Sequence, residues 1–309
     1  MGTIEPSDHL PSRMVELGYL QRSINGVDVI IPPVCNVPGG EFLMGSNRKL
    51  DPQAFAPEMP QHHVVLPAYQ IGTFQVTVAE YACFVRATSH VLPITDGLVD
   101  WECQLERLDH PVVCITWDDA MDYVGWLAKL TSEPWRLPSE AEWEKAARWD
   151  PSTCTVRVYP WGDVFDETRC NVSVSAGVDL GTTNPVGTYL SGVSPVGTYL
   201  SGVSPYGAHD MTGNVWEWTS SLYSPYPTPN LMEWLKRRVS PNLYSFDKDE
   251  VANNLENNRM LRGGSFFTIP SRAHPAFRAF SGWVGEASDP DMINRSADAG
   301  FRLARSVAR

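Results

Sequence analysis

The chain has 309 residues, of which 43% are hydrophobic, and its 36 acidic and 24 basic side chains give a formal net charge of -12. This length can bury a substantial core, and the negative charge disfavours nucleic acid as a partner because phosphate backbones are repelled. The N-terminus has no basic region followed by an apolar run, and no segment has about 18 consecutive apolar residues. We therefore expect a cytoplasmic protein without a membrane partner, with its six scattered cysteines reduced.

The N-terminal part of the chain predicts mainly strands. Residues 1–37 are expected to form an extension packed on a domain that covers residues 38–309. A short strand is expected over 39–46, and a pair of strands over 63–74, where β-forming residues alternate along the sequence.

Three helices are expected in the middle of the chain. Thr77 can cap a helix over 78–88, and apolar residues recur at helical spacing over 117–130. The third helix begins after Ser139, which forms a capping box with Glu142 because each side chain can bond to the backbone amide of the other.

The sequence beyond Trp161 predicts long loops, since Gly, Pro, Asn and Asp recur every few residues, and bound cations often stabilise such loops. PVGTYLSGVS at 185–194 recurs at 195–204, as in a tandem duplication within a surface loop, because solenoid repeats are longer. Residues 221–258 are interpreted as an insertion. The chain returns with RMLRGGSFF and AGFRLARS, both predicted as core strands. The dispersed C-terminal arginines are interpreted as structural partners of acidic residues.

Six motifs occur in order over residues 38–305, namely GEFLMGS, RLPSEAEWEKAAR, YPWGD, GNVWEWTSS, LRGGS and GFRLA. In this combination the chain resembles the formylglycine-generating-enzyme, or sulfatase-modifying-factor, family. That family includes sulfatase-activating enzymes, the C-terminal domains of ergothioneine-type sulfoxide synthases and the variable ligand-binding proteins of diversity-generating retroelements. The resemblance implies an α+β fold, a loop-rich variant of the C-type lectin fold with few regular elements.

A calcium site is expected in the GNVWEW region. Two carboxylates and nearby main-chain carbonyls lie in one short glycine-containing loop, and such hard oxygens suit calcium. The resemblance implies a structural calcium with side-chain ligands from Asp210 and Glu217 and carbonyl ligands from Gly213 and Val215. The alternative is a polar turn whose carboxylates cap backbone amides.

The resemblance also implies a second calcium, held by Asn171 and the carbonyl of Val172 together with ligands from the following loop. That loop departs from the family in sequence, and Asp179 is the candidate for its remaining side chain.

The copper site of the family is missing from the sequence. In formylglycine-generating enzymes two cysteines follow the GGS motif, the first three positions after the serine and the second five further on, and their thiolates bind copper(I). Here Thr268 and Ala273 hold these positions, and no cysteine lies C-terminal to Cys170. We therefore expect no copper and none of the family's oxidase chemistry.

Other catalytic patterns are also missing. The sulfoxide-synthase branch holds iron through an HxxxHxE helix in a separate N-terminal domain, and none of the seven histidines has this spacing. His62 and His63 are adjacent on an expected strand, where their rings would point to opposite faces and form a poor chelate. No nucleophile elbow and no phosphate-binding loop are recognisable.

The segment between Gly264 and Gly300 lies where the family builds its active site. Aromatic side chains interspersed with polar ones suit recognition of another molecule, although the aromatics could instead belong to the core. In the retroelement proteins this segment carries the diversified, ligand-facing positions. The predicted ligand-binding residues are Phe266, Phe267, Thr268, His274, Phe277, Arg278, Phe280, Ser281 and Trp283.

The sequence therefore favours a non-catalytic, calcium-stiffened binding protein that displays residues 266–299 to a protein or small-molecule ligand. One alternative is a metal-dependent oxidoreductase of the same superfamily with a site that is not copper. Another is an interaction domain for a sulfatase-like or defence partner.

Overall fold

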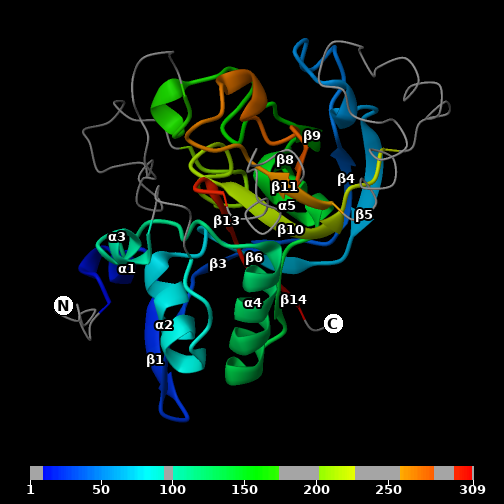
Figure 1. Ribbon diagram of the computed structural model, residues 1–309. Coiled ribbons are helices and arrows are strands. Elements are labelled where there is room, and N and C mark those ends of the chain that lie inside the picture. Colours follow the sequence, from blue (N-terminus) through cyan, green and yellow to red (C-terminus); the bar gives the residue numbers. More distant parts are fainter. Residues whose placement is uncertain (1–9, 94–99, 174–201, 227–257, 282–295, 308–309) are drawn as a thin grey trace, which may run out of the picture.

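The computed structural model describes residues 10–93, 100–173, 202–226, 258–281 and 296–307 (Figure 1). Within these residues, short helices and strands are joined by long loops, which confirms the α+β, loop-rich prediction. Most of the duplicated segment and of the expected insertion over 221–258 lies outside the described residues. None of the described helices is long and apolar enough to cross a membrane.

One four-stranded sheet carries the segments around the expected site. Its strand order is β12–β11–β10–β13, in which β10 runs antiparallel to β11 and parallel to β13. The strands are β10 (Trp216–Leu222), β11 (Arg259–Arg262), β12 (Ala279–Phe280) and β13 (Ala299–Phe301). The two predicted C-terminal core strands are thereby confirmed, although AGFRLARS divides into β13 and a further strand, β14.

The second four-stranded sheet is antiparallel, with the order β3–β6–β14–β7. Its strands are β3 (Val34–Val37), β6 (Tyr69–Gly72), β7 (Trp135–Arg136) and β14 (Ala304–Ser306). Both strands expected over 63–74 form, but they do not pair with each other. The first of them, β5 (His62–Leu66), pairs with β4 (Gly40–Met44), because Pro67 separates it from β6 and the chain there passes from one sheet to the other.

Part of the expected N-terminal extension contributes to the core. The short helix α1 (Ser12–Glu16) precedes a hairpin of β1 (Leu20–Ile24) and β2 (Val27–Ile31). Asn25 and Gly26 connect these strands with φ values of 53° and 78°, as a two-residue hairpin turn requires. Val29 and Ile30 of β2 are buried, and β3 belongs to the second sheet, so this part of the expected extension packs with the rest of the described chain.

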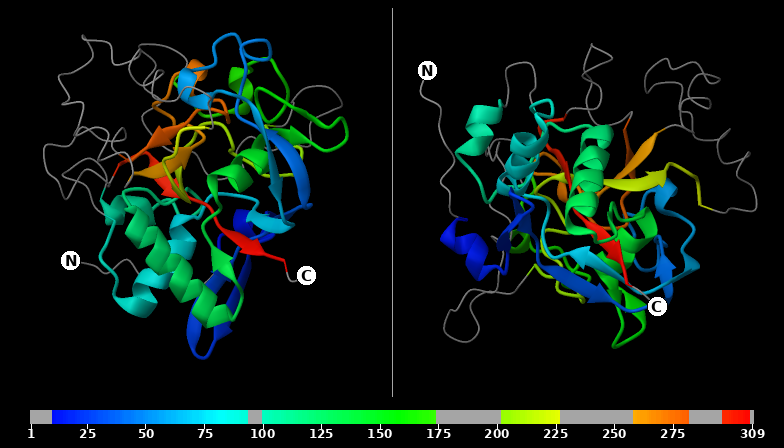
Figure 2. Two further views of the ribbon diagram at one scale, coloured as in Figure 1. Left: turned by 90° about the vertical axis from the view of Figure 1, so that its right-hand side faces the viewer. Right: turned by 90° about the horizontal axis from the view of Figure 1, so that it is seen from below.

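The three expected helices are confirmed as α2 (Val78–Thr88), α4 (Trp117–Thr131) and α5 (Glu140–Arg148), and each begins with a capping box. A short helix, α3 (Trp101–Leu105), was not expected. Helices α2 and α4 lie side by side at one end of the molecule, and the loops around the 3-10 turns lie at the other (Figures 1 and 2). These turns are η1 (Ala56–Glu58), η2 (Glu167–Arg169) and η3 (Pro270–Arg272).

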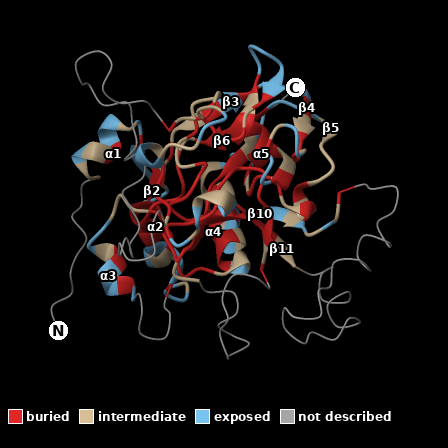
Figure 3. Cartoon of the chain, turned by 90° about the horizontal axis from the view of Figure 1, so that it is seen from above, coloured by how far each residue is buried: buried red, intermediate tan, exposed pale blue. Residues whose placement is uncertain are grey.

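The core runs between the two sheets and the helices that cover them, where Figure 3 shows buried residues along β6, β10 and α5. Trp143 of α5 and Trp218 of β10 are among its largest fully buried side chains. A small ribbon of β8 (Trp149–Asp150) and β9 (Thr155–Val156) follows α5.

Buried ion pairs connect the C-terminal strands to α5 and β10, as expected for the arginines. Arg262 pairs with Glu144, Arg278 with Glu140, and Arg302 with Glu217. These side chains are almost completely buried, so losing one partner would leave an uncompensated charge in the core.

Candidate functional site

The candidate site is built around residues 263–281, which we call the site segment and which connect β11 to β12. Gly263 and Gly264 have φ values of 98° and 76°, which residues with a Cβ adopt only at a cost. A Cβ on Gly264 would lie 2.8 Å from Ala273 Cα and 3.5 Å from Thr268 Cβ. The loop therefore brings Thr268 and Ala273 to the same glycine, but neither side chain can supply a thiolate.

Thr268 links the site segment to the preceding loop. Its hydroxyl accepts a hydrogen bond from the backbone amide of Ser265 at 2.9 Å, and its carbonyl accepts one from Ser173 at 3.0 Å. The hydroxyl of Ser265 in turn donates to Asp298 at 2.5 Å. These contacts fix the start of the segment against residues on either side of it.

Most of the predicted ligand-binding residues are buried, so the prediction that they are displayed is wrong for them. Phe277 packs with ring-centroid distances of 5.3 Å to Phe55 and 6.1 Å to Trp216. The other buried members of the predicted set are Phe266, His274, Arg278 and Ser281. These residues complete the core beneath the segment, which was the alternative interpretation of its aromatic content.

Arg278 is held by the scaffold. Its Nε and Nη2 atoms donate to the two carboxylate oxygens of Glu140 at 2.6 and 2.9 Å, and its guanidinium lies 4.0 Å from the ring centroid of Tyr226. It also donates to the carbonyls of Pro57 and Ser224. This set of contacts anchors η1 to the site segment and gives Arg278 a structural role.

Part of the site segment does face solvent. Phe267 is 60% exposed and Ile269 is 49% exposed, and Thr268 between them is partly exposed. Phe280 is partly buried and lies 5.2 Å from Tyr223, measured between ring centroids. Trp283 lies outside the described residues.

An open cavity of about 610 Å³ lies in another loop of the described chain. It is lined by residues 161–169, which we call the cavity loop. The rings of Trp161 and Phe165 pack against the cluster of Cys170, Val172 and Ala273, so the cavity lies beside the position of the missing second cysteine. The sequence analysis did not identify this loop as a binding element, although YPWGD marked its beginning.

The cavity is both aromatic and acidic. Trp161 stacks on Tyr159 with a centroid distance of 5.4 Å and an interplanar angle of 8°. Among its lining residues are Asp163, Asp166 and Glu167, against one arginine, Arg169, which pairs with Asp166 at 2.9 Å. An aromatic face next to surplus negative charge attracts cationic ligands.

Cys170 is the cysteine nearest to this site in sequence. Burial raises the pKa of its thiol to about 12, and the neighbouring charge of Asp166 adds to the effect. The thiol is therefore protonated at neutral pH and lacks the reactivity of a thiolate.

The predicted calcium ligand Glu217 is surrounded by hydrogen-bond donors. Arg302 donates from Nε and Nη2 to its two carboxylate oxygens at 2.6 and 2.7 Å. Trp143 Nε1 donates to Oε2 at 2.6 Å, and Gln75 Nε2 donates to Oε1 at 3.0 Å. Each oxygen thus accepts two hydrogen bonds, and the guanidinium supplies the positive charge.

One of the two main-chain carbonyls predicted as calcium ligands, that of Val215, lies beside the same amide, together with the carbonyl of Asp210. Gln75 Nε2 is 3.4 Å from the carbonyl oxygens of both Asp210 and Val215. Gly213 has a φ of 79°, and a Cβ there would collide with the carbonyl of Asn171. Nitrogen donors therefore surround the Glu217 carboxylate, and the calcium site stays a prediction.

The residues of the second predicted calcium site lie against the first. Asn171 forms a bridge with Gly213, and its carbonyl accepts from the amide of Asn214 at 2.8 Å. Val172 is buried, and Asp179 lies outside the described residues. The structure therefore joins the two predicted sites into one connected region of loop.

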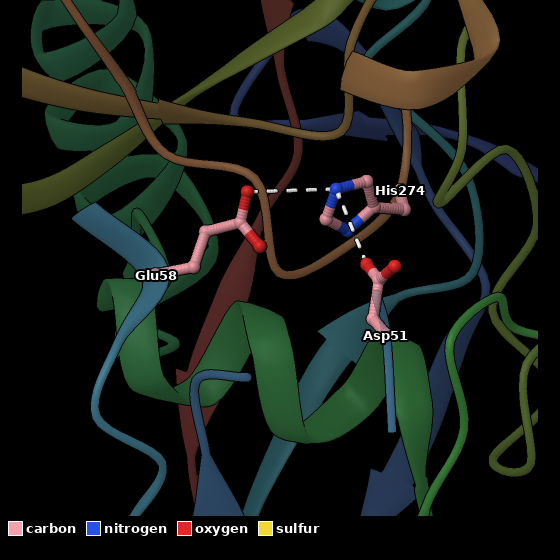
Figure 4. A group of neighbouring side chains, drawn as sticks. All are labelled: Asp51, Glu58 and His274. Atoms are coloured by element: carbon pink, nitrogen blue, oxygen red, sulfur yellow. Dashed lines mark ion pairs between the residues drawn. The ribbon is translucent and has the colours of Figure 1, made fainter. Parts of the chain in front are cut away.

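His274 faces two carboxylates that the sequence analysis did not connect with it. Asp51 and Glu58 lie more than 200 positions earlier in the chain, yet both side chains reach the imidazole (Figure 4). Burial raises the pKa of Glu58 to about 8. Burial, reinforced by the charges of Arg148 and Arg262, lowers the pKa of His274 to about 3.

Comparison with known proteins gives the family. The sulfatase-modifying factor enzyme 1-like domain matches residues 27–307. Hercynine oxygenase of Mycolicibacterium smegmatis is 32% identical over 297 residues, covering 88% of this chain and 60% of that protein. The inactive C-alpha-formylglycine-generating enzyme 2 of Mus musculus is 29% identical over 239 residues, covering 63% and 70% of the two chains.

A solved structure shares the fold. Treponema denticola variable protein 1 superposes with a TM-score of 0.57 at 18% identity, over 93% of this chain and 99% of that one. Since this chain spans less than two thirds of the hercynine oxygenase that it matches, the likeness covers part of that relative only. The chain belongs to the sulfatase-modifying factor family and has its formylglycine-generating-enzyme-like variant of the C-type lectin fold.

Proposed function

We propose that this chain is a ligand-binding member of the family, and that its ligand enters the cavity beside the site segment. The observation that supports the proposal is that the cavity loop packs against the cluster that contains Ala273, one of the two positions at which the family has its copper-binding cysteines. Thr268 and Ala273 occupy the copper positions, while the cavity of about 610 Å³ is lined by aromatic rings. A cavity of this size is typical of small-molecule sites.

The lining indicates the kind of ligand. Trp161 and Phe165 offer apolar contact, and Glu167 lies at the cavity with an exposed side chain. Asp163 accepts a hydrogen bond from the amide of Val158, and Asp166 is engaged by Arg169, so Glu167 is the carboxylate with most freedom to meet a ligand. We expect a ligand with a cationic group next to an apolar one, whether a small molecule or a side chain of a protein partner.

A pair of probes tests this expectation. Benzyltrimethylammonium carries the cation, and neopentylbenzene has nearly the same shape without charge. Calorimetric titration of the full chain should show saturable binding of the cation alone. Glu167→Gln and Trp161→Ala should each weaken it about fivefold, consistent with roughly 1 kcal/mol for a cation–π or charge contact. Glu106→Gln, which changes an exposed carboxylate on another face, is the matched control.

Two results would overturn the proposal. Equal binding of the neutral probe would mean that the positive charge of the ligand does not contribute to binding. Cation binding unchanged in Trp161→Ala, detected by calorimetry, would place it elsewhere. Circular dichroism of both variants shows whether the fold is intact.

The other candidate is a metal-dependent oxidoreductase, favoured by the 32% identity to a protein named an oxygenase. Elemental analysis of the purified protein separates the two candidates. One equivalent of iron or copper, together with oxygen consumption, would favour the oxidoreductase.

A further inference from the structure

The Asp51–Glu58–His274 group lies outside both the cavity lining and the predicted calcium sites. Figure 4 shows the two carboxylates approaching the imidazole from separate segments. The Nε2 atom of His274 is 3.5 Å from Glu58 Oε1 and 3.8 Å from Asp51 Oδ2. One ligand atom from each residue can be chosen so that all three lie within 4.8 Å of one another.

The three side chains are held in place by their backbone neighbours. The carbonyl of Glu58 accepts a hydrogen bond from the amide of Ser46 at 2.8 Å. Asp51 Oδ1 accepts from the amide of Gln53 at 2.9 Å, which leaves Oδ2 directed at the imidazole. The backbone of His274 accepts from the amide of Phe277 at 2.9 Å.

The buried polar atoms of this group make few hydrogen bonds. Glu58 is 0% exposed and His274 is 2% exposed. In the described part of the chain, neither oxygen of the Glu58 carboxylate and neither ring nitrogen of His274 makes a hydrogen bond of good geometry, although the backbone of Phe55 lies near the carboxylate and that of Ser271 near the imidazole. Buried polar atoms without partners are rare in native proteins, and the binding of an ion is one reason for them.

The neighbouring guanidiniums are not ion-pair partners of Glu58 or Asp51. Arg148 and Arg262 lie close enough to influence His274, but both are engaged by the carboxylate of Glu144. Among the described residues, the ion-pair contacts of Asp51 and Glu58 are with His274 alone.

We propose that Asp51, Glu58 and His274 bind a divalent metal ion that accepts both nitrogen and oxygen ligands, with Zn²⁺ as its representative. Ligands at the usual Zn–N and Zn–O distances in a tetrahedral site are about 3.4 Å apart. The 3.5 and 3.8 Å separations at His274 are close to this value, and all three ligand atoms lie within 4.8 Å, so binding requires the two carboxylates to move toward each other and toward the imidazole. Three protein ligands leave one tetrahedral position for water or a further ligand.

The donor set also selects against other ions. A neutral imidazole suits zinc, iron and related transition metals, whereas calcium prefers six to eight oxygens. The group contains no thiolate, which excludes the soft ligation that copper(I) prefers. The side chain of Asp51 is 10% exposed, which makes it the member of the group nearest to solvent.

The test uses the full chain, stripped of metal by EDTA and then dialysed free of the chelator. Calorimetric titration with ZnCl₂ should show one equivalent bound, and Zn²⁺ should raise the Tm by several degrees because it binds the folded state. Glu58→Gln and His274→Gln should each weaken this binding at least tenfold, because each removes a ligand while keeping a side chain of similar size.

His209→Gln is the matched control. His209 is also largely buried, with a pKa lowered by burial, but it stacks on Phe74 and lies outside the group. It should bind Zn²⁺ like the wild type. Co²⁺ gives a second readout, since ligation by nitrogen and oxygen produces d–d absorption without a thiolate charge-transfer band.

Three outcomes would overturn the proposal: no Zn²⁺ bound by the wild type, binding unchanged in Glu58→Gln, or a thiolate band with Co²⁺. The first would mean that Glu58 keeps a proton and bonds directly to the imidazole. Melting curves recorded in EDTA show whether the variants fold, and we expect Glu58→Gln to fold because it leaves no buried charge behind. The binding probe used for the cavity has no part in this test, so the two proposals fail independently.

Discussion

Replacing Arg302 by leucine should destabilise the chain by about 3–5 kcal/mol, because a buried carboxylate would lose its charged partner. Both Arg302 and Glu217 are 0% exposed. The guanidinium makes two hydrogen bonds to Glu217, and others to the carbonyls of Gly72 and His209 at 3.1 and 2.9 Å. Arg302→Leu removes all of these contacts at once.

The expected loss corresponds to a fall in Tm of roughly 5–8 °C for a chain of 309 residues. Thermal denaturation followed by circular dichroism measures it. Arg305→Leu is the matched control, since Arg305 pairs with Glu133 on the surface and such pairs contribute about 0–1 kcal/mol. A loss in Arg302→Leu no larger than that of the control would refute the reasoning.

The same experiment bears on calcium. Because Arg302 supplies the positive charge at Glu217, we expect excess calcium to leave the Tm of the metal-stripped wild type unchanged. A calcium-dependent rise in Tm, lost in Glu217→Gln, would contradict this expectation and support the calcium ligands predicted from the sequence.

Three further predictions concern single positions. Burial raises the pKa of Glu80 to about 8. Its contribution to stability is therefore full below about pH 4.5 and is lost as the pH rises toward 8. Urea denaturation across this range should show that the free energy of unfolding depends less on pH in Glu80→Gln than in the wild type. Gly264→Ala should destabilise the chain by about 2–4 kcal/mol in the same assay, because the backbone of Gly264 is left-handed and the new Cβ would lie 2.8 Å from Ala273 Cα. Gly125→Ala should not destabilise it, because Gly125 is an exposed position of α4 with free space around it. Iodoacetamide should alkylate exposed Cys154 quickly and buried Cys170 slowly, as peptide mass spectrometry would show.

Local features of the fold could be predicted from the sequence. The capping box of Ser139 and Glu142 lies within four residues, so its hydrogen bonds follow from the chain itself. Burial within the site segment could not be predicted in this way. Phe277 belongs to the core because Phe55 and Trp216 lie against it, and neither is near it in sequence.

The chemistry of the site was predictable only where residue identity decides it. Thr268 and Ala273 cannot provide thiolates in any conformation, so that part follows directly from the sequence. The group formed by Asp51, Glu58 and His274 depends on loops that meet only in the folded chain. No spacing along the sequence marks such a group, in contrast to motifs whose ligands share one helix.

The most direct test of the central claim is Cu(I) binding by the full chain under anaerobic conditions, in competition with bathocuproine disulfonate. The double variant Thr268→Cys/Ala273→Cys restores the thiolate pair beside Gly264 and serves as the positive control. Our account predicts that the variant takes up one equivalent of Cu(I) and that the wild type loses all of it to the competitor. Retention of one equivalent by the wild type, with an affinity equal to that of the variant, would contradict the account.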